Sequence, residues 1–217
     1  MTSCFIVIWA LNLIFQKLSK YTEQLLEDCF YHIYNRTNGN ENSFLDTRDY
    51  TVFLRGLEKY ILPYCQIYAY CLLPNHFHLV LSIESNLAFR VIKSGKTRNK
   101  SQEVSDFLPL QFSKWFNSYS KYFNSRYQRK GSLFTRPFKR RRVSDIVYLR
   151  KLIHYVHYNP VEAKLCLKPN DWVFSSYQAI LSDKKTQVSK NEVIELFDNK
   201  DNFIYCHNIE PKLSGLE

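Results

Sequence analysis

The sequence is poor in the residues that mark loop-rich or disulfide-bonded proteins. Only five of its 217 residues are glycine, and no two of its six cysteines have CxxC spacing. In a chain of 26.0 kDa this usage indicates neither a disulfide framework nor a zinc knuckle, so we expect reduced, buried thiols. Hydrophobic residues make up 45% of the chain and aromatic residues 16%, which is enough for a substantial core.

No apolar run in the N-terminal region is long enough to cross a membrane. Residues 5–15 (FIVIWALNLIF) are almost all apolar, but a membrane-spanning helix needs about 20 such residues. No basic segment precedes the run and no small-residue cleavage pattern follows it. A core or docking helix, a membrane-surface segment and a misassigned start site stay open. We expect residues 1–28 to form an N-terminal helical extension without stable membrane association.

Acidic residues are outnumbered, with 20 Asp and Glu against 30 Lys and Arg, and the formal net charge is +10. A domain this basic usually binds an anionic partner, most often nucleic acid, although a merely soluble surface is the alternative. The segment 126–142 has eight cations, no acid and interleaved aromatic residues. Cations follow a phosphate backbone while aromatic rings stack on unpaired bases, which favours DNA over a solvated charge run. The predicted DNA contacts are Arg126, Arg129, Lys130, Arg136, Lys139, Arg140, Arg141, Arg142, Tyr127 and Phe138.

Alternation of apolar and polar residues predicts three strands before the basic segment. They cover residues 29–36, 65–73 and 76–83, and each is rich in β-branched or aromatic side chains. Only Pro74 and Asn75, a typical turn pair, separate the second strand from the third. The two strands therefore should form an antiparallel hairpin.

Helical spacing of apolar residues predicts the remaining elements. Helices are expected at 47–61, 106–127, 145–160 and near 190–197. Asp46 and Ser144 should cap the first and third of these helices, and Pro160 should end the third. With a strand in the basic segment, the order is strand, helix, strand, strand, helix, strand, helix. This order predicts an α+β, ferredoxin-like antiparallel sheet with helices on one face, followed by a helical C-terminal extension at 166–217.

The sharpest chemical feature is the sequence His76-Phe77-His78 on a predicted strand. Side chains alternate along a strand, so the two imidazoles share one face and lie roughly 6–7 Å apart, where they can converge on one divalent metal ion. Phe77 shares the core face with Leu79 and Leu81, which places the histidines under a helix or in a cleft. Two polar residues on the wet face of a sheet are the alternative, because HxH often occurs by chance.

A second feature is the pair Tyr155 and Asn159 on the helix that precedes Pro160. Residues four apart share a helix face, so the phenol and the amide can act at one place. Beside a metal-bound phosphate a tyrosine can attack as a nucleophile, and an amide oxygen suits Mg²⁺ or Mn²⁺ as a third ligand. Core packing for Tyr155 and a helix cap for Asn159 are the alternative roles.

Several motifs occur together in one order. They are YHIYNR (31–36), YCLLPNHFHLVL (70–81), GSLFTRPFKRRRV (131–143), YLRKLIHYVHYNPVEAKL (148–165) and DWVFSSY (171–177). Together they resemble the REP-associated tyrosine transposases, relatives of the insertion-sequence transposases that act on single strands. The resemblance covers residues from about 29 to 180, and LPNHFH followed by YxxxNPV is far rarer than HxH.

This resemblance implies an HUH nuclease domain at 29–165 that cleaves single-stranded, hairpin-forming DNA of repetitive palindromes. It implies transesterification through a 5′-phosphotyrosine, with Tyr155 as the nucleophile and His76, His78 and Asn159 as metal ligands. Tyr148 and Tyr158 flank Tyr155, but Tyr158 lies on another helix face and Tyr148 lies two turns away. A cytoplasmic, nucleoid-associated protein of a prokaryote is expected, as a monomer or a homodimer.

Two other functions compete with a transposase-like DNA endonuclease. One is a regulator that binds DNA hairpins without catalysis, for which an intact Tyr155 would be unnecessary. The other is a metal-dependent hydrolase that uses His76 and His78 on a substrate unrelated to nucleic acid. That enzyme would ignore single-stranded DNA even at low salt, where phosphate contacts are strongest.

Overall fold

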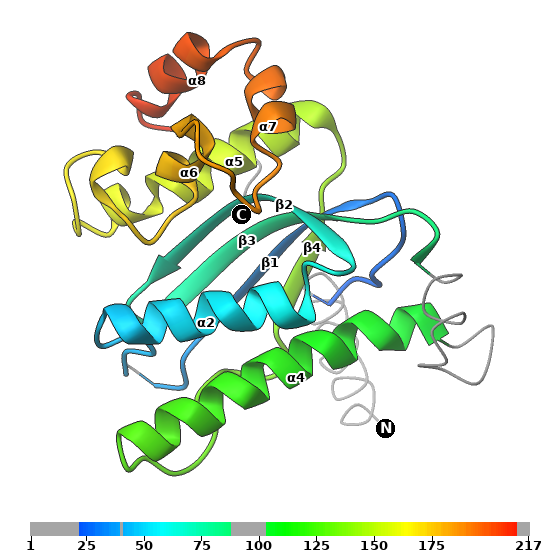
Figure 1. Cartoon of the computed structure of the whole chain (residues 1–217), viewed down its shortest axis with the longest axis vertical. Helices are drawn as coiled ribbons and strands as arrows, with labels where there is room; N and C mark the ends of the chain where they lie inside the picture. Colours follow the sequence, from blue (N-terminus) through cyan, green and yellow to red (C-terminus); the bar gives the residue numbers. More distant parts are fainter. Residues whose placement is uncertain (1–21, 40, 88–102, 212–217) are drawn as a thin grey trace, which may run out of the picture.

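The computed structural model describes residues 22–39, 41–87 and 103–211, and side chains from residue 106 onward in the last range. In this part of the chain a four-stranded antiparallel sheet lies between two helical layers, as Figure 1 shows. Residues 1–21 of the expected N-terminal helical extension lie outside the described residues, and its remaining residues, 22–28, form no helix. No helix among the described residues is both long enough and apolar enough to cross a membrane.

The sheet contains the three predicted strands and a fourth strand in the basic segment. The strands are β1 (Phe30–Arg36), β2 (Cys65–Leu73), β3 (His76–Ile83) and β4 (Lys139–Arg142), in the spatial order β2-β3-β1-β4. β2 and β3 form the expected hairpin, with Leu73 opposite His76 across a two-residue turn. β1 therefore lies between β3 and β4, and the described residues 22 and 23 line the other side of β4 at Arg140.

Two helices, α2 (Thr47–Tyr60) and α4 (Glu103–Arg126), cover one face of the sheet (Figure 1). Asp46 begins α2 as predicted, through a capping box with Asp49. Phe77, Leu79, Leu81 and Ile83 of β3 point into this layer, and Trp115 of α4 donates a hydrogen bond to the Phe53 carbonyl there at 2.9 Å. Gly56 permits this contact, because a Cβ atom there would lie 2.3 Å from the Trp115 ring.

The opposite face of the sheet carries α5 (Ile146–Glu162) and the C-terminal helices, as Figure 1 shows. The helices of the predicted domain thus divide between the two faces, with α2 and α4 on one face and α5 on the other, where the C-terminal helices join it. The elements of the C-terminal segment are the 3-10 turn η1 (Pro169–Asp171), α6 (Tyr177–Leu181), α7 (Lys190–Leu196) and α8 (Lys200–His207). Four buried residues of α5 pack against this face of the sheet, as expected from their spacing: Leu149, Leu152, Ile153 and Val156.

Both predicted ends of α5 shift by one or two residues. Asp145, rather than Ser144, is the N-cap, since its carboxylate accepts the Tyr148 amide at 2.8 Å. Pro160 does not end the helix, which continues to Glu162. The proline sits in the last turn, where its carbonyl still accepts the Leu165 amide at 2.8 Å. Because proline has no backbone N–H, the helix loses only the one hydrogen bond that this amide would have donated.

Candidate active site

β3 presents His76 and His78 together on the face that α5 covers. Phe77, between them, is buried in the α2–α4 layer, so the strand alternates as predicted. The two imidazole centroids are 5.3 Å apart. His78 is buried and His76 is half-buried, which places the pair under a helix rather than on a wet sheet face.

Each imidazole of the pair is held through its Nδ1 atom. His76 Nδ1 lies 2.6 Å from the Asn75 side-chain oxygen, which can only accept, so His76 carries its proton at Nδ1. His78 Nδ1 lies 2.9 Å from Nε2 of His32 on β1. When His32 accepts this hydrogen bond, both members of the pair present an unprotonated Nε2. This is the arrangement that a hydrogen bond to the far nitrogen imposes on histidines that bind metal.

Burial keeps both imidazoles neutral near neutral pH. Desolvation lowers the pKa of His76, and the nearby Arg36 guanidinium lowers this pKa further. Desolvation also holds the pKa of His78 well below its usual range, with smaller contributions from His32 and His76. A neutral imidazole is the form that can donate a lone pair to a metal ion.

α5 brings Tyr155 and Asn159 to the same place. The Tyr155 ring meets the His78 ring edge-on, with centroids 5.7 Å apart. Asn159 donates to the Tyr155 carbonyl at 3.0 Å, and its side chain lies near enough to the His76 imidazole and the Tyr155 phenol to shift the pKa of each. Burial raises the pKa of Tyr155, and the nearby Asn159 side chain acts in the opposite direction. The four residues that the sequence singled out therefore form one cluster.

The two competing tyrosines lie away from this cluster. The Tyr148 hydroxyl is buried, has no hydrogen-bond partner in the described part of the chain, and its ring lies 5.6 Å from the Arg141 guanidinium carbon. The Tyr158 ring contacts His154 on the side of α5 that faces the C-terminal helices. Tyr155 is the tyrosine of α5 whose ring touches the histidine pair.

The donor set at this cluster fits a hard divalent ion through two imidazoles and one amide oxygen. Within the residues that the structure describes, no three His, Cys, Asp or Glu side chains are arranged to hold a metal. A metal ion here would therefore take its third protein ligand from Asn159, whose side chain lies near enough to His76 to affect the pKa of that imidazole. Two neutral imidazoles, each fixed through Nδ1, and an amide oxygen are chemically suitable for this task.

Sequence reasoning missed His32, which the structure places directly behind His78. The His32 ring also stacks on Tyr34, with centroids 4.6 Å apart, and Tyr34 faces His78 across the strands. The alternation of YHIYNR puts His32 and Tyr34 on one face, and a sheet in which β1 borders β3 puts that face beside the histidine pair. The register of the two strands was the missing information.

Comparison with known proteins supports the fold but not, at the level of sequence, the family. No protein-family model matches the chain, and no curated protein matches it. Among solved structures, a REP-associated tyrosine transposase bound to a REP hairpin superposes with a TM-score of 0.54, covering 76% of this chain and 86% of that one. The two proteins share one fold. At 16% identity the likeness confirms the predicted α+β architecture and leaves the roles of the site residues as predictions.

The first cations of the basic segment serve the fold rather than an open surface. Arg126 forms ion pairs with Asp46 and Asp49 at the start of α2. Arg129 pairs with Glu41 at 2.5 Å and donates to carbonyls of its own loop. Both guanidiniums are therefore already neutralised by acids, which weakens the prediction that they contact DNA.

The two aromatic residues that were predicted to stack on bases are also engaged. Phe138 is 8% exposed and packs against Phe112 with ring centroids 5.0 Å apart, so the expectation of base stacking is wrong for it. The Tyr127 hydroxyl donates to Asp49 at 2.9 Å, and its ring packs on Phe123. Both rings belong to the α2–α4 layer, because the segment that carries them returns across that layer to reach β4.

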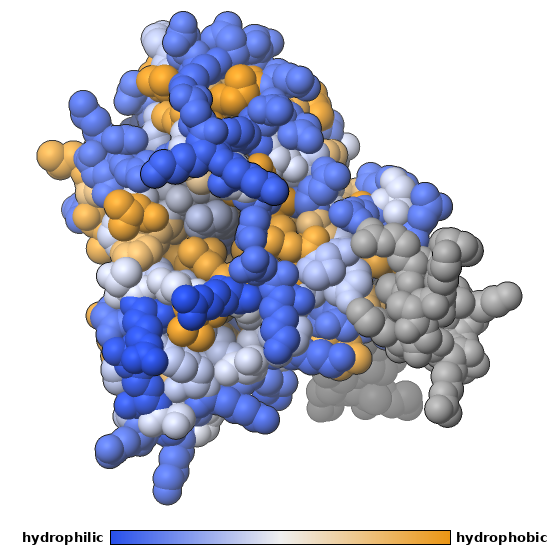
Figure 2. All heavy atoms as spheres, in the orientation of Figure 1, coloured by the Kyte–Doolittle hydropathy of each residue, from blue (hydrophilic) through white to orange (hydrophobic). Residues whose placement is uncertain are grey.

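The remaining cations divide between the two faces of β4. Lys139 lies directly opposite Tyr34, and Arg141 lies directly opposite His32, in the pairing of β1 with β4. Residues opposite one another on neighbouring strands point to the same side of a sheet, so both cations share the face of the candidate site. Arg140 and Arg142 point to the opposite face, where Arg140 Nε donates to the Glu23 carbonyl. Lys130 and Arg136 are exposed before the strand. In the orientation of Figure 1, hydrophilic residues cover much of the surface, as Figure 2 shows.

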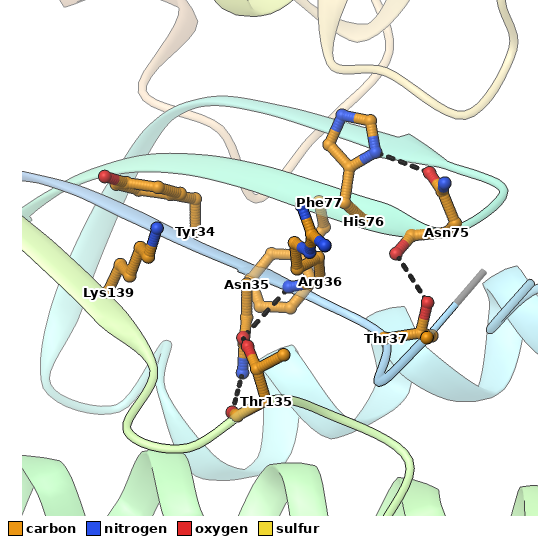
Figure 3. Close-up of a pocket in the computed structure, with 10 residues that line it drawn as sticks. Tyr34, Asn35, Arg36, Thr37, Asn75, His76, Phe77, Thr135 and Lys139 are labelled. Carbon is orange, nitrogen blue, oxygen red and sulfur yellow. Dashed lines mark hydrogen bonds between the residues drawn. The ribbon is translucent and has the colours of Figure 1, made fainter. Parts of the chain in front are cut away.

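A cavity of about 320 Å³ adjoins the histidine pair at the end of β1 (Figure 3). The residues that line it are Tyr34, Asn35, Arg36, Thr37, Gly39, Asn75, His76, Phe77, Thr135 and Lys139. Figure 3 shows Arg36 near its centre, with Tyr34 and Lys139 to one side and His76 and Asn75 to the other. His76 is thus shared between the cavity and the cluster around Tyr155.

Proposed function

We propose that this protein is a metal-dependent single-stranded DNA endonuclease and strand transferase, with Tyr155 as its nucleophile. The observation that carries the proposal is the contact of the Tyr155 ring with His78, which lies beside His76, while Asn159 shares the helix face of Tyr155 in the same chain. A half-buried phenol beside two neutral imidazoles and an amide is suited to attack on a phosphodiester, whereas core packing alone does not require these polar groups to lie together.

In this reaction the Tyr155 hydroxyl oxygen forms a bond to the scissile phosphorus, and the bond from phosphorus to the 3′-oxygen breaks. The strand is left with a 5′-phosphotyrosine and a free 3′-hydroxyl, and the phenolic proton is balanced by the proton that the 3′-oxygen takes up. His76, His78 and Asn159 would hold Mg²⁺ or Mn²⁺, which supplies charge neutralisation at the phosphate when bound. Because burial raises the pKa of Tyr155, its phenol is protonated in the free protein and needs activation.

Single-stranded DNA with hairpins is the proposed substrate. Lys139 and Arg141 lie on the same sheet face as the cluster, where cations can position a phosphate backbone. The structural neighbour was solved bound to a REP hairpin, which supports a folded repetitive palindrome as the form of the DNA. Since the cluster is complete within one chain, a monomer would suffice for cleavage.

A covalent-adduct assay tests the nucleophile. Purified protein is incubated with single-stranded oligonucleotides that carry a hairpin flanked by randomised unpaired segments, in Mg²⁺ or Mn²⁺, and resolved on a denaturing gel. The wild type should give a protein–DNA adduct, which should disappear in Tyr155→Phe. Tyr148→Phe is the matched control, because its phenol lies on the same helix outside the cluster, and it should keep the adduct.

The same assay separates the competing functions. His76→Ala should abolish the adduct but retain DNA binding, since the cations of β4 are untouched. If the wild type binds the hairpin but forms no adduct, the nuclease proposal is wrong, and a regulator that binds DNA hairpins without catalysis is the better interpretation. An adduct that persists in Tyr155→Phe would overturn the assignment of the nucleophile.

A further inference from the structure

The cavity beside His76 has the lining of a site for an anionic ligand. Arg36 and Lys139 are among its ten lining residues, and no acidic residue is. Both cations are exposed, and Arg36 is close enough to His76 to depress the pKa of that imidazole. An anion bound at Arg36 would therefore lie next to the proposed metal ligand and next to the scissile phosphate.

The walls of the cavity are fixed by hydrogen bonds that do not use the cations. The Thr37 amide donates to the Asn75 carbonyl at 2.9 Å. The Thr37 hydroxyl lies 2.6 Å from the Glu41 carbonyl and 3.2 Å from the Asn75 carbonyl, and Figure 3 shows the second of these contacts. Asn35 exchanges two hydrogen bonds with Thr135. These contacts hold β1, the β2–β3 turn and the segment before β4 around a preformed space, which reduces the cost of ordering a ligand.

Size and chemistry together select one nucleotide as the occupant. At about 320 Å³ the cavity is at the lower end of the range of about 300–1,000 Å³ that is typical of small-ligand sites, so it cannot admit a duplex. Tyr34 gives it an aromatic wall, and Lys139 Nζ lies 5.6 Å from the centroid of that ring. A cation pair with an adjacent aromatic ring is the combination that binds the phosphate and the base of an unpaired nucleotide.

We propose that this cavity binds the unpaired nucleotide that adjoins the scissile phosphate, with its own phosphate at Arg36 and Lys139 and its base toward Tyr34. The proposal rests on the proposed DNA-cleaving function and adds the place where the strand is held during attack. Such a subsite would fix the register of the strand relative to Tyr155, because His76 forms part of both.

The test measures binding without cleavage, in full-length Tyr155→Phe protein. Fluorescence anisotropy gives the affinity for a hairpin oligonucleotide with unpaired flanks and for deoxythymidine monophosphate, over a series of salt concentrations. Arg36→Ala and Lys139→Ala are compared with Arg55→Ala and Lys121→Ala, which remove the same charges from exposed positions on α2 and α4. A parallel set of oligonucleotides carries 5-iododeoxyuridine at successive flanking positions, for photo-crosslinking and peptide mapping.

We expect Arg36→Ala and Lys139→Ala each to weaken oligonucleotide binding about tenfold and to reduce the salt slope by about one, with less than a twofold effect of the controls. Crosslinks from one flanking position should map to Tyr34. If Arg36→Ala weakens oligonucleotide binding no more than Arg55→Ala does, and no crosslink maps to Tyr34, the subsite proposal is wrong. The proposed DNA-cleaving function would still stand in that case. Binding of the mononucleotide alone, or of neither probe, would overturn both.

Discussion

The hydrogen bond between His32 and His78 leads to a quantitative prediction about a residue that never touches the substrate. In His32→Leu the Nδ1 proton of His78 loses its acceptor at a buried position, 2.9 Å from the missing nitrogen. An unsatisfied buried donor costs about 1–3 kcal/mol, which corresponds to about 5–150-fold in an equilibrium constant. Loss of a hydrogen bond behind a metal ligand typically lowers metal affinity or activity about 10–100-fold, and the two ranges agree.

Two measurements assign this cost to the site rather than to folding. Calorimetric titration with Mn²⁺ should show an affinity about 10–100-fold lower in His32→Leu, and cleavage should recover as the Mn²⁺ concentration is raised. His32→Gln, whose amide oxygen can accept the same proton, should lose less. His154→Leu is the matched control, because His154 binds the Ile209 carbonyl in the C-terminal layer and not the cluster. Unchanged Mn²⁺ affinity in a folded His32→Leu protein would refute the reasoning.

Three further predictions concern the fold and the basic segment. Gly56→Ala should lower the free energy of unfolding in urea by about 1–3 kcal/mol, since its Cβ would lie 2.3 Å from Trp115, although the same change in an open helix usually stabilises. Burial lowers the pKa of His207 to about 3, from the ordinary histidine pKa of about 6.5, so the unfolded chain binds the proton first as the pH falls. Stability should therefore fall by up to about 1.4 kcal/mol per pH unit below about pH 6.5, and equal urea midpoints at pH 7 and pH 5 would contradict this. Arg129→Ala should lower the melting temperature with little effect on DNA affinity, because Arg129 pairs with Glu41. Arg141→Ala should lower DNA affinity with little effect on the melting temperature, because Arg141 lies on the sheet face of the site; thermal melts and anisotropy measure the two quantities.

The local elements could be predicted from the sequence because each follows from a short-range pattern. β2 and β3 begin and end where alternation and the Pro74-Asn75 turn place them. The i, i+4 spacing of Tyr155 and Asn159 gives them one helix face whatever the fold. In the structure α5 packs over β2 and β3 on the face opposite α2 and α4, and this packing brings the four predicted residues together.

The features that were not predicted depend on register and on packing between distant segments. His32 acquires its place only through the pairing of β1 with β3, in which His32 stands opposite Val80 and diagonal to His78. Phe138 looks like an exposed aromatic within a charged run, but the chain turns it into the core beside α4. Arg126 and Arg129 look free in sequence, and acids from the region of residues 41–49 neutralise them in the fold.

The other side of α5 explains how one chain can hold Tyr155 against the sheet. His207 Nδ1 lies 2.8 Å from the Phe203 carbonyl, which only accepts, so His207 must accept from His157 Nδ1 at 3.0 Å. His157 Nε2 is then left to accept the Ser176 hydroxyl at 2.7 Å. The Ser176 oxygen in turn accepts the Tyr70 amide of β2 at 2.9 Å.

This chain of hydrogen bonds runs in one direction from β2 through Ser176 and His157 to α8, with every imidazole neutral. Burial holds the pKa of His157 well below its usual range, which maintains that state. His157 is two residues from Tyr155, so the same helix turn that faces the histidine pair is anchored from behind by the C-terminal segment. The position of the proposed nucleophile is therefore set by residues beyond 165 as much as by the sheet, which explains why a helix joined to β4 by a short connection can lie over β2 and β3 in its own chain.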